Sequence, residues 1–511
     1  MSNQIRQKFD IIINGGGIVG FTLLNLILKS PALRRSKVLL IEQAAKPADF
    51  RQPPRFREDI SPDGNGGAAS DYQQQDPGHG VEPPQTHFSN RVSSITHKSR
   101  LALRKTGVWD SIKKYTKEVK GIKVWNYDYA HRIVFHPNQM EDCRDEDRHS
   151  VFSVVENNRL SLALLNNLGV KNDLILWNHA LCRLRRSDSG LLEIAMTDKQ
   201  TGDEIIADTA LVLGCDGFKS KVRELSGMAY SEIDLRKTAI VGTFRVDMST
   251  IGCSVDNSVA YQKFSAEKDT VIALLPLDPH HSSFVISAPH DYAKELMAHD
   301  QETFSSEVNR LLASVESPRN CLLRSLHSIA NSGDDYLRKS VLATLFPANN
   351  STLEKESAIE EPPRVESLID GSRACYPLVF GTTTPKMRGK LAGSQYSQVA
   401  LLGDSSHRVH PLAGQGLNLG IQDAIELVEQ LESKLKCGQR LFSEHDITSL
   451  DSALRGYECK RQTYIVPMSA AILSMPQIFK LMPSHMISSL NRCEPIKNMS
   501  VRFANGYQCL N

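Results

Sequence analysis

The chain has 511 residues, of which 60 are basic and 58 acidic, so its formal net charge is +2. This balance argues against a nucleic-acid partner, which usually requires a concentrated basic face. A single core rarely grows beyond about 250–300 residues, so two or more lobes are expected, and 41% hydrophobic residues are enough to fill them.

Cysteines and apolar runs bear on where the protein works. Ten cysteines occur without a CxxC pair or a ligand cluster, which favours free thiols in a reducing compartment and predicts no metal. No secretory signal is expected, and the first nine residues are too short for a convincing transit peptide. The apolar run Tyr464–Met475 is shorter than the ~20 residues of a spanning helix, and Pro467 and Pro476 are expected to interrupt its surroundings. The sequence therefore predicts a chain that does not cross a membrane, while contact with a membrane surface stays open.

The first elements are typical of a βαβ unit. Phe9–Asn14 and Lys37–Glu42 are predicted to be buried parallel strands, joined by an apolar helix over Ile18–Lys29. Residues 51–85 contain glycines, prolines and three consecutive glutamines, but few large apolar side chains. We interpret them as a disordered surface insertion, and favour a tolerated expansion over a lid or partner-binding loop.

Strands and helices alternate through the middle of the chain, and helices dominate after Gly420. Periodicity predicts helices near Lys98–Thr106 and over Asn158–Leu168, whereas Ala343–Glu361 is loop-like. The predicted strands are Ile122–Asn126 paired with His131–Phe135, Leu174–Trp177, Leu184–Ile194, Ile205–Leu213 and several within Lys237–Ser287.

A glycine-rich turn, GGGIVG at 15–20, separates the first strand from the first helix. In this GxGxxG pattern Gly15 makes the tight turn, Gly17 lets the backbone approach a pyrophosphate, and Gly20 allows close helix–strand packing. Glu42 ends the next strand, where a carboxylate can bind a pair of ribose hydroxyls. A plain glycine turn is the competing interpretation, but strand, helix and acid together favour dinucleotide binding.

Two later segments each run from a buried strand into a glycine turn. In LVLGCDGFKS at 211–220, Asp216 lies in a Gly-x-Asp-Gly turn, which taken alone is more often structural. In residues 399–420, a buried strand ends at Asp404, which suits a ribitol hydroxyl, and a loop leads into a helix start at Gly414–Leu417. Amides at that helix start favour the negative charge that a reduced flavin carries.

The three segments together resemble those of flavin monooxygenases of the para-hydroxybenzoate hydroxylase type. HPLAGQGLNLG at 410–420, followed by Asp423, is similar to the signature of the ubiquinone (coenzyme Q) biosynthesis hydroxylases. The resemblance extends over nearly the whole chain except the insertion. Four further segments are similar to the eukaryotic mitochondrial branch: SNRVSSI at 89–95, VEN at 155–157, ALLPL at 273–277 and PIKN at 495–498.

This resemblance implies an α/β fold, in which a discontinuous Rossmann-like FAD-binding domain holds an inserted β-rich substrate domain and is followed by a helical C-terminal region. The FAD-binding domain would comprise residues 9–120, 151–235 and 396–435. The substrate domain would comprise the strand pair at 121–150 and residues 236–395. The helical C-terminal region would be 436–511, with a candidate membrane or partner contact.

The resemblance also implies which residues surround FAD. The ADP half would be held by Gly15, Gly17, Gly20 and Glu42. Arg91 would lie near the flavin and the pyrophosphate, Asp216 and Gly217 near the pyrophosphate and the substrate-side cleft, and Asp404 near ribitol or phosphate. The isoalloxazine ring would be lined by Pro411, Gly414, Gln415, Gly416 and Leu417.

Some positions depart from the family pattern. Cys215 and the pair Ser405–Ser406 replace alanines near the flavin. Ala266–Val271 lacks the usual Gly-Pro, and Ile286 stands where the branch often has tryptophan. The last two lie in the expected substrate half, so they bear on the substrate rather than on FAD.

The resemblance implies an enzyme that hydroxylates a polyprenylated phenol at ring carbon 5, using dioxygen and a flavin C4a-hydroperoxide. The cofactor carries this chemistry, so no side chain is assigned as catalyst, and His407 and His410 are interpreted as loop support rather than bases. Each buried CH₂ contributes ~0.8 kcal/mol, so a polyprenyl substrate stays in the bilayer. The expected location is peripheral, on the matrix side of the mitochondrial inner membrane, within a coenzyme Q biosynthesis complex. Ile465–Leu490 is a candidate contact surface, equally consistent with a helical cap on the protein's own core.

Other functions stay open on the sequence. They are an FAD monooxygenase of a soluble aromatic acid, an FAD-dependent isoprenoid reductase, and a non-catalytic FAD-bound organiser of a biosynthetic complex. One dinucleotide fingerprint is found, and it is assigned to FAD. The electron donor is therefore open between NAD(P)H and a ferredoxin with its reductase.

Overall fold

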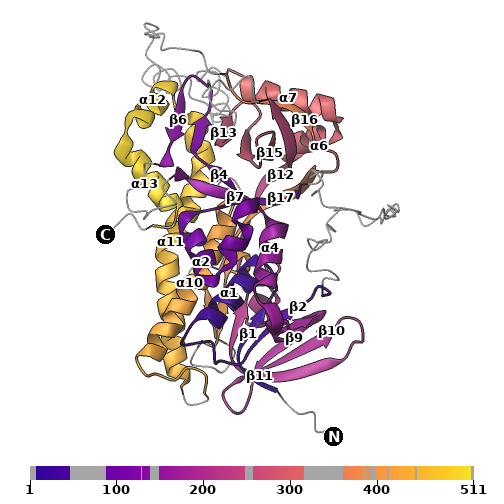
Figure 1. Cartoon of the computed structure of the whole chain (residues 1–511), viewed down its shortest axis with the longest axis vertical. Coiled ribbons are helices and arrows are strands. Elements are labelled where there is room, and N and C mark those ends of the chain that lie inside the picture. Colours follow the sequence, from indigo (N-terminus) through magenta and orange to yellow (C-terminus); the bar gives the residue numbers. More distant parts are fainter. Residues whose placement is uncertain are drawn as a thin grey trace, which may run out of the picture.

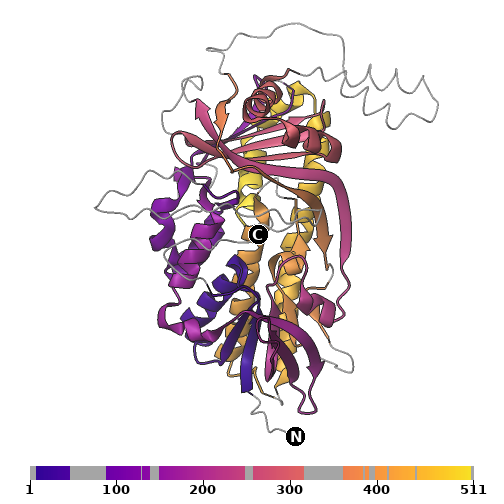
Figure 2. The same cartoon turned by 90° about the vertical axis from the view of Figure 1, so that its right-hand side faces the viewer.

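The computed structural model describes residues 7–46, 88–127, 129–137, 149–247, 257–315, 361–383, 386–390, 397–410, 414–443 and 446–507. The predicted insertion at 51–85, and nearly all of the loop-like stretch Ala343–Glu361, lie outside these residues. The described elements form two sheet-centred lobes, and a long helix runs along both of them (Figure 1; Figure 2).

The first lobe is built on a mostly parallel sheet. β1 (Gln7–Asn14) lies between β2 (Val38–Glu42) and β11 (Glu204–Gly214), and α1 (Ile18–Lys29) is the crossover helix from β1 to β2. Ile11 and Ile13 pack into one core and Ile12 into another, so β1 is covered on both faces. This explains its continuous apolar sequence and confirms the predicted βαβ unit.

β11 changes partners along its second edge. Its first half pairs antiparallel with β10 (Leu192–Asp198), and its last three residues pair parallel with β19 (Val399–Leu401). The carboxyl ends of β1, β11 and β19 are therefore neighbours, and each runs into one of the three glycine turns. The full strand order is β18 (Arg388–Gly389), β19, β11, β1, β2 and β8 (Ile175–Trp177), with β9 (His179–Arg186) beyond β10.

The predicted strand Leu184–Ile194 is wrong as a single strand. The amides of Ser187 and Gly190 close a tight turn between β9 and β10, and Gly190 has a φ of 84°. The turn needs this left-handed backbone, which glycine adopts without strain. The apolar residues on both sides belong to two antiparallel strands.

Helices cover the first sheet around the largest hydrophobic core. α1 packs against α4 (Asn157–Asn166) and α10 (Gln415–Lys436). A small sheet beside them has the order β3 (Val92–Ile95), β7 (Phe152–Glu156), β4 (Lys117–Val119). The remaining elements of this lobe are α2 (His97–Thr106), α3 (Val108–Ile112), η1 (Lys113–Tyr115), η4 (Gly169–Leu174), α5 (Lys221–Leu225) and η6 (Gly403–Ser405).

The second lobe is a nine-stranded, mainly antiparallel sheet. One face packs on α6 (His290–Ala298) and α7 (Gln301–Ala313). The predicted strand pair is confirmed as β5 and β6 and belongs to this sheet. Its order is β20 (His407–Arg408), β17 (Ala374–Thr382), β12 (Ser231–Asp247), β15 (His281–Pro289), β14 (Thr270–Pro276), β13 (Val259–Ser265), β5 (Gly121–Trp125) and β6 (Arg132–Phe135), with β16 (Arg364–Leu368) also on β12.

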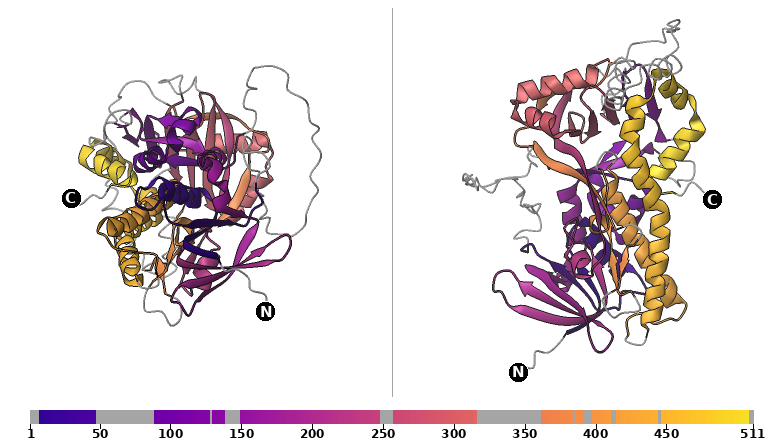
Figure 3. Two further views of the ribbon diagram at one scale, coloured as in Figure 1. Left: turned by 60° about the horizontal axis from the view of Figure 1, so that its bottom comes forward. Right: turned by 180° about the vertical axis from the view of Figure 1, so that it is seen from behind.

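The C-terminal helix α11 (Ile447–Leu481) touches β18 in the first sheet and β13 in the second (Figure 3). It is continuous through Pro467 and Pro476, which corrects the prediction that these prolines interrupt the apolar run. Burial of one face, including Ile465, Ile472 and Pro476 itself, offsets the lost backbone hydrogen bonds. α12 (Ser484–Arg492) and α13 (Glu494–Ala504) follow.

Among the described residues, α11 is the one helix long and apolar enough to cross a membrane by length and composition. A core helix passes the same test, and 33% of the apolar window is buried inside the protein. The helix therefore gives only weak evidence of a membrane span.

Candidate functional site

The first glycine turn packs tightly on the turn that follows β11. Gly15 has a φ of 109°, and a Cβ on it would lie 2.5 Å from the carbonyl oxygen of Cys215. A Cβ on Gly20 would lie 2.0 Å from the carbonyl oxygen of Gly15. In contrast, a Cβ on Gly17 would meet no atom of the described residues within 4 Å. The space beside the N-terminus of α1 is therefore open, next to backbone N–H groups that favour an anion.

The carboxylate of Glu42 closes this turn. Oε2 accepts a hydrogen bond from the amide of Gly16 at 2.5 Å, and Oε1 accepts one from the amide of Ala44 at 2.7 Å. Each carboxylate oxygen keeps a second lone pair. Glu42 is thus held at the end of β2 and can still accept a bond from a ribose hydroxyl.

Asp216 joins the end of β1 to the start of α5. Its Oδ2 accepts from Nδ2 of Asn14 at 2.8 Å and from the amides of Lys221 at 2.7 Å and Val222 at 3.2 Å. Its Oδ1 is buried and has no partner within the described part of the chain. A buried acceptor without a donor costs free energy, so this oxygen suits a hydroxyl or water donor better than a pyrophosphate anion.

The third glycine turn is fixed to β3 by Asn418, a residue that the sequence analysis did not single out. Its Oδ1 accepts from the amide and hydroxyl of Thr96 at 3.0 and 3.1 Å. Its Nδ2 donates to the carbonyls of Ser94 at 2.8 Å and Gly414 at 3.1 Å. Gly414 has a φ of 59°, and a Cβ on it would lie 2.5 Å from Oγ of Ser94. In the sequence, the position of Asn418 between Gly416 and Gly420 was the one sign that this polar side chain could hold the turn.

Asp404 lies beside this helix start. A Cβ on Gly416 would be 3.8 Å from Oδ1 of Asp404. The side chain of Asp404 keeps exposed surface, but the protein packed around it displaces water and raises the pKa of its carboxyl. The positive charges of His407, Arg408 and Arg91 oppose that rise. Arg91 and Asp404 therefore come together, as the resemblance implies for two residues near a flavin.

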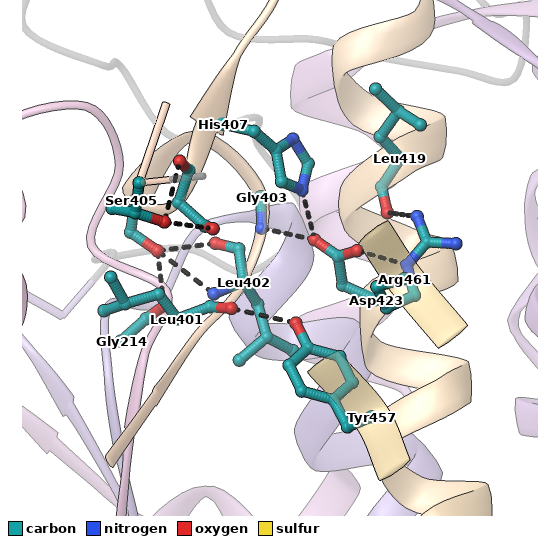
Figure 4. A network of polar contacts seen from close by, with 12 residues as sticks. Gly214, Leu401, Leu402, Gly403, Ser405, His407, Leu419, Asp423, Tyr457 and Arg461 are labelled. Carbon is teal, nitrogen blue, oxygen red and sulfur yellow. Dashed lines mark hydrogen bonds and ion pairs between the residues drawn. The ribbon is translucent and has the colours of Figure 1, made fainter. Parts of the chain in front are cut away.

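A buried polar network holds the same turn in place (Figure 4). Oδ2 of Asp423 accepts from the amide of Gly403 at 2.8 Å and from Nε2 of His407 at 2.6 Å, and Oδ1 accepts from Nε of Arg461 at 2.6 Å. Burial raises the pKa of Asp423, but these partners outweigh it and hold the pKa below its usual value. His407 is therefore part of the hydrogen-bond network that holds this loop in place.

The serine departures have a structural role. Oγ of Ser405 donates to the carbonyls of Gly214 and Leu402, both at 2.6 Å. Nη1 of Arg223 donates to the carbonyl of Ser405 at 2.7 Å. The hydroxyl that replaces the family's usual methyl therefore cross-links the second and third turns.

The remaining ring-lining predictions fall around the start of α10. Gln415 is buried, and its Oε1 has no partner among the described residues. Leu417 packs partly buried against the first-lobe core. Pro411 lies outside the described residues.

The second sheet faces this site with a defined set of side chains. Ala239 pairs with both Ser287 and Tyr376 across antiparallel strands, so their side chains share one face. Oγ of Ser287 is 3.2 Å from Nε2 of His410, and the charges of Arg91 act on Tyr376. This face therefore meets the loop that leads to the third glycine turn. Burial lowers the pKa of His410 to about 4, with help from nearby lysines, so its imidazole is neutral.

Ile286 does not lie on that face. It pairs with Ile240, and both pack against Tyr292 and Phe304 in the core beneath α6 and α7. Ile286 therefore points to the side of the sheet opposite to Ser287, and the bearing of this departure on the substrate stays a prediction.

Comparison with known proteins agrees with this geometry. The model of the FAD binding domain family matches residues 84–329 and 381–446, more than half of the chain. The chain belongs to the FAD binding domain family. It binds FAD, as predicted, and is an FAD-dependent monooxygenase. The open space at Gly17 fits such a ligand, as do the buried oxygens of Asp216 and Gln415 that have no partner within the described ranges.

Individual relatives narrow the resemblance. The chain is 29% identical to the mitochondrial ubiquinone biosynthesis monooxygenase COQ6 of Xenopus tropicalis over 97% of this chain and 93% of that one. For its Mus musculus counterpart the identity is 27%, over 97% and 91%. The solved structure of P. aeruginosa PqsL with 2-aminobenzoylacetate shares the fold, with a TM-score of 0.59, 16% identity, and coverage of 95% and 99%. The resemblance to the ubiquinone biosynthesis branch and the predicted fold class are confirmed.

Proposed function

We propose that this protein hydroxylates a polyprenylated phenol in ubiquinone biosynthesis, at ring carbon 5. The similarity to relatives of that name over nearly the whole chain carries this proposal. Bound FAD would supply the oxygen-activating chemistry, through the C4a-hydroperoxide that the resemblance implies. Dioxygen is the co-substrate.

The chain's own residues would bind and orient the cofactor. Gly15, Gly17 and Gly20 would place the N-terminus of α1 against the pyrophosphate, and Glu42 would bind the adenosine ribose. Asp216 would accept a bond from a ligand hydroxyl or an ordered water through Oδ1. These roles rest on the open space at Gly17 and on Oδ1 of Asp216, which no described donor satisfies.

The flavin end would lie between the third glycine turn and the face of the second sheet. Asp404 would bind ribitol, Arg91 would lie near the flavin, and the amides of Gly414, Gln415, Gly416 and Leu417 would face its N1–O2 edge, with Pro411 beside the ring. A helix N-terminus favours negative charge there. The sheet face of Ala239, Ser287 and Tyr376 would then bound the substrate side.

We further propose a peripheral position on the matrix side of the mitochondrial inner membrane. Six of the twelve large apolar side chains that are exposed among the described residues lie in the last helices, at 39–52% exposure. The opposite face of α11 packs on the protein's own core. Within Ile465–Leu490, one face would thus contact the membrane while the other caps the core. The six side chains, called the C-terminal apolar surface, are Val466, Ile478, Leu481, Met486, Ile496 and Met499.

A turnover experiment tests the function. FAD-loaded protein is given a short-tailed prenyl phenol and oxygen, with either NAD(P)H or a ferredoxin and its reductase as electron donor. We expect a product that has gained one oxygen atom with one of the two donors, and ring position follows from its NMR spectrum. Turnover without oxygen would indicate an isoprenoid reductase, and preference for a tail-free aromatic acid would indicate a soluble substrate. Bound flavin and biosynthetic partners without any product would indicate an organiser of the complex.

A further inference from the structure

Two lysines share one carboxylate beside the sheet face described above. Oδ1 of Asp269 accepts from Nζ of Lys237 at 2.9 Å and also from Nζ of Lys480. Lys237 donates as well to the backbone carbonyl of Asp269, at 2.9 Å. The lysines come from β12 and α11, and Asp269 lies in the turn between β13 and β14, within the segment that lacks the family's Gly-Pro.

This cluster carries an excess of positive charge. The side chains of Lys237 and Lys480 are 14% and 5% exposed, so solvent screens them poorly. Burial lowers the pKa of Lys480 to about 8, aided by the charge of Lys237, so it is still largely charged at neutral pH. Asp269 offsets only one of the two ammonium groups, and His410 is neutral.

The excess charge borders the face that meets the loop before the third glycine turn. Lys237 is two residues from Ala239 on β12, so both side chains project from the same side of the sheet. Both lysines also act electrostatically on His410, which touches Ser287 on that face. An anionic group bound over Ala239 and Ser287 would therefore lie in the field of two lysines.

We propose that Lys237 and Lys480 supply the positive charge that binds a negatively charged oxygen substituent on the substrate's aromatic ring. The substituent is a phenolate, formed by loss of its proton to solvent, or a ring carboxylate. This inference rests on the proposed function, because it assumes an aromatic substrate on this face. Asp269 would set the strength of the charge by neutralising one lysine.

Binding of small probes to the FAD-loaded protein tests the charge without turnover. Benzoate and benzamide are matched in shape and differ in charge, and their dissociation constants follow from changes in the visible flavin spectrum. We expect wild type to prefer benzoate and Lys237→Met to lose about tenfold in benzoate affinity, as for a charge-assisted hydrogen bond, with benzamide unchanged. Asp269→Asn should shift benzoate in the opposite direction, and asparagine tolerates the φ of 49° at this position. Lys199→Met, at an exposed turn, is the matched control.

A second probe separates the two sources of charge. 4-Nitrophenol absorbs visible light as phenolate, so its ionised fraction when bound is measured below its solution pKa. A raised fraction that falls in Lys237→Met points to a phenolate, and a response confined to benzoate points to a ring carboxylate. Equal binding of benzoate and benzamide with no raised phenolate fraction, or no effect of either cluster variant, would overturn the inference. Anion preference without hydroxylation of the prenyl phenol would count against the proposed function alone.

Discussion

His407 and Asp423 are hydrogen-bonded across 2.6 Å in a site that excludes solvent from both side chains. The same carboxylate holds the amide of Gly403, which precedes Asp404. The imidazole therefore helps to hold the third glycine turn in place, which agrees with loop support rather than a role as a base.

Replacing this imidazole should loosen the cofactor without abolishing the chemistry. In His407→Ala we expect the free energy of unfolding to fall by about 1–3 kcal/mol, since a buried charged acceptor loses a donor. FAD affinity should fall, while turnover per bound FAD is retained at saturating FAD. Fluorescence titration and turnover check this, with the exposed His280→Ala as control. Lost turnover at full FAD occupancy would show that His407 is an essential base.

The two glycines of the first turn should respond differently to the same methyl group. Gly20→Ala places a Cβ 2.0 Å from a backbone oxygen, so the apoprotein should be strongly destabilised or fail to fold. Position 17 has an ordinary φ of −74°, and a Cβ there meets no atom in the part of the chain that the structure describes, so the Gly17→Ala apoprotein should keep its melting temperature. If the pyrophosphate lies there, Gly17→Ala should still lose FAD. Unchanged FAD affinity in that variant would remove the pyrophosphate from this turn.

Charge placed on the C-terminal apolar surface should release the protein from membranes. We expect Ile478→Asp combined with Ile496→Asp to reduce flotation with vesicles of mitochondrial lipid composition, because a carboxylate resists burial. Flavin content should not change. Ile233→Asp alters an equally exposed isoleucine on β12 and is the control. Equal loss of binding in the control would contradict the assignment of this surface.

The buried imidazole of His410 predicts a specific dependence of stability on pH. Its pKa is lowered on folding, so between its ordinary value and about 4 the unfolded chain binds more protons than the folded one. Its contribution to stability is therefore complete above the ordinary pKa and is lost as pH falls toward 4. The free energy of unfolding of wild type minus that of His410→Gln should fall by up to about 3 kcal/mol over that interval. Denaturant unfolding at several pH values measures it, and a flat difference would contradict a depressed pKa.

The βαβ unit and each glycine turn followed from local sequence, because each is written in contiguous residues, whereas a shared site for the three turns was implied only by the family resemblance. The parallel order of β1, β11 and β19 then brings the turns together. Long-range polar contacts carry no such local pattern. Asn418 and Arg461 were missed because their partners, Thr96 and Asp423, lie 322 and 38 residues away.

Other errors have physical causes as well. The β9–β10 turn was hidden because its flanking residues are apolar enough to resemble one strand. Pro467 and Pro476 were taken as breaks because local propensity ignores the burial of the surrounding helix face. The side of the sheet to which Ile286 points was not predicted, because it depends on strand register and a one-residue shift would reverse it. The domain boundaries and the FAD-contacting residues stay predictions.

The helix α11 is tied to the first lobe by Arg461 and to the second by Lys480. These anchors are nineteen positions apart along the helix, about 28 Å at a rise of ~1.5 Å per residue. A helix anchored at both points fixes the spacing of the two sheets. A hinge motion between the lobes would therefore have to break a buried ion pair or bend α11. Both prolines fall between the anchors, where two missing backbone hydrogen bonds make bending easiest. Ligand entry is then expected to depend on movements of the loops, and any bending of α11 should be concentrated between residues 461 and 480.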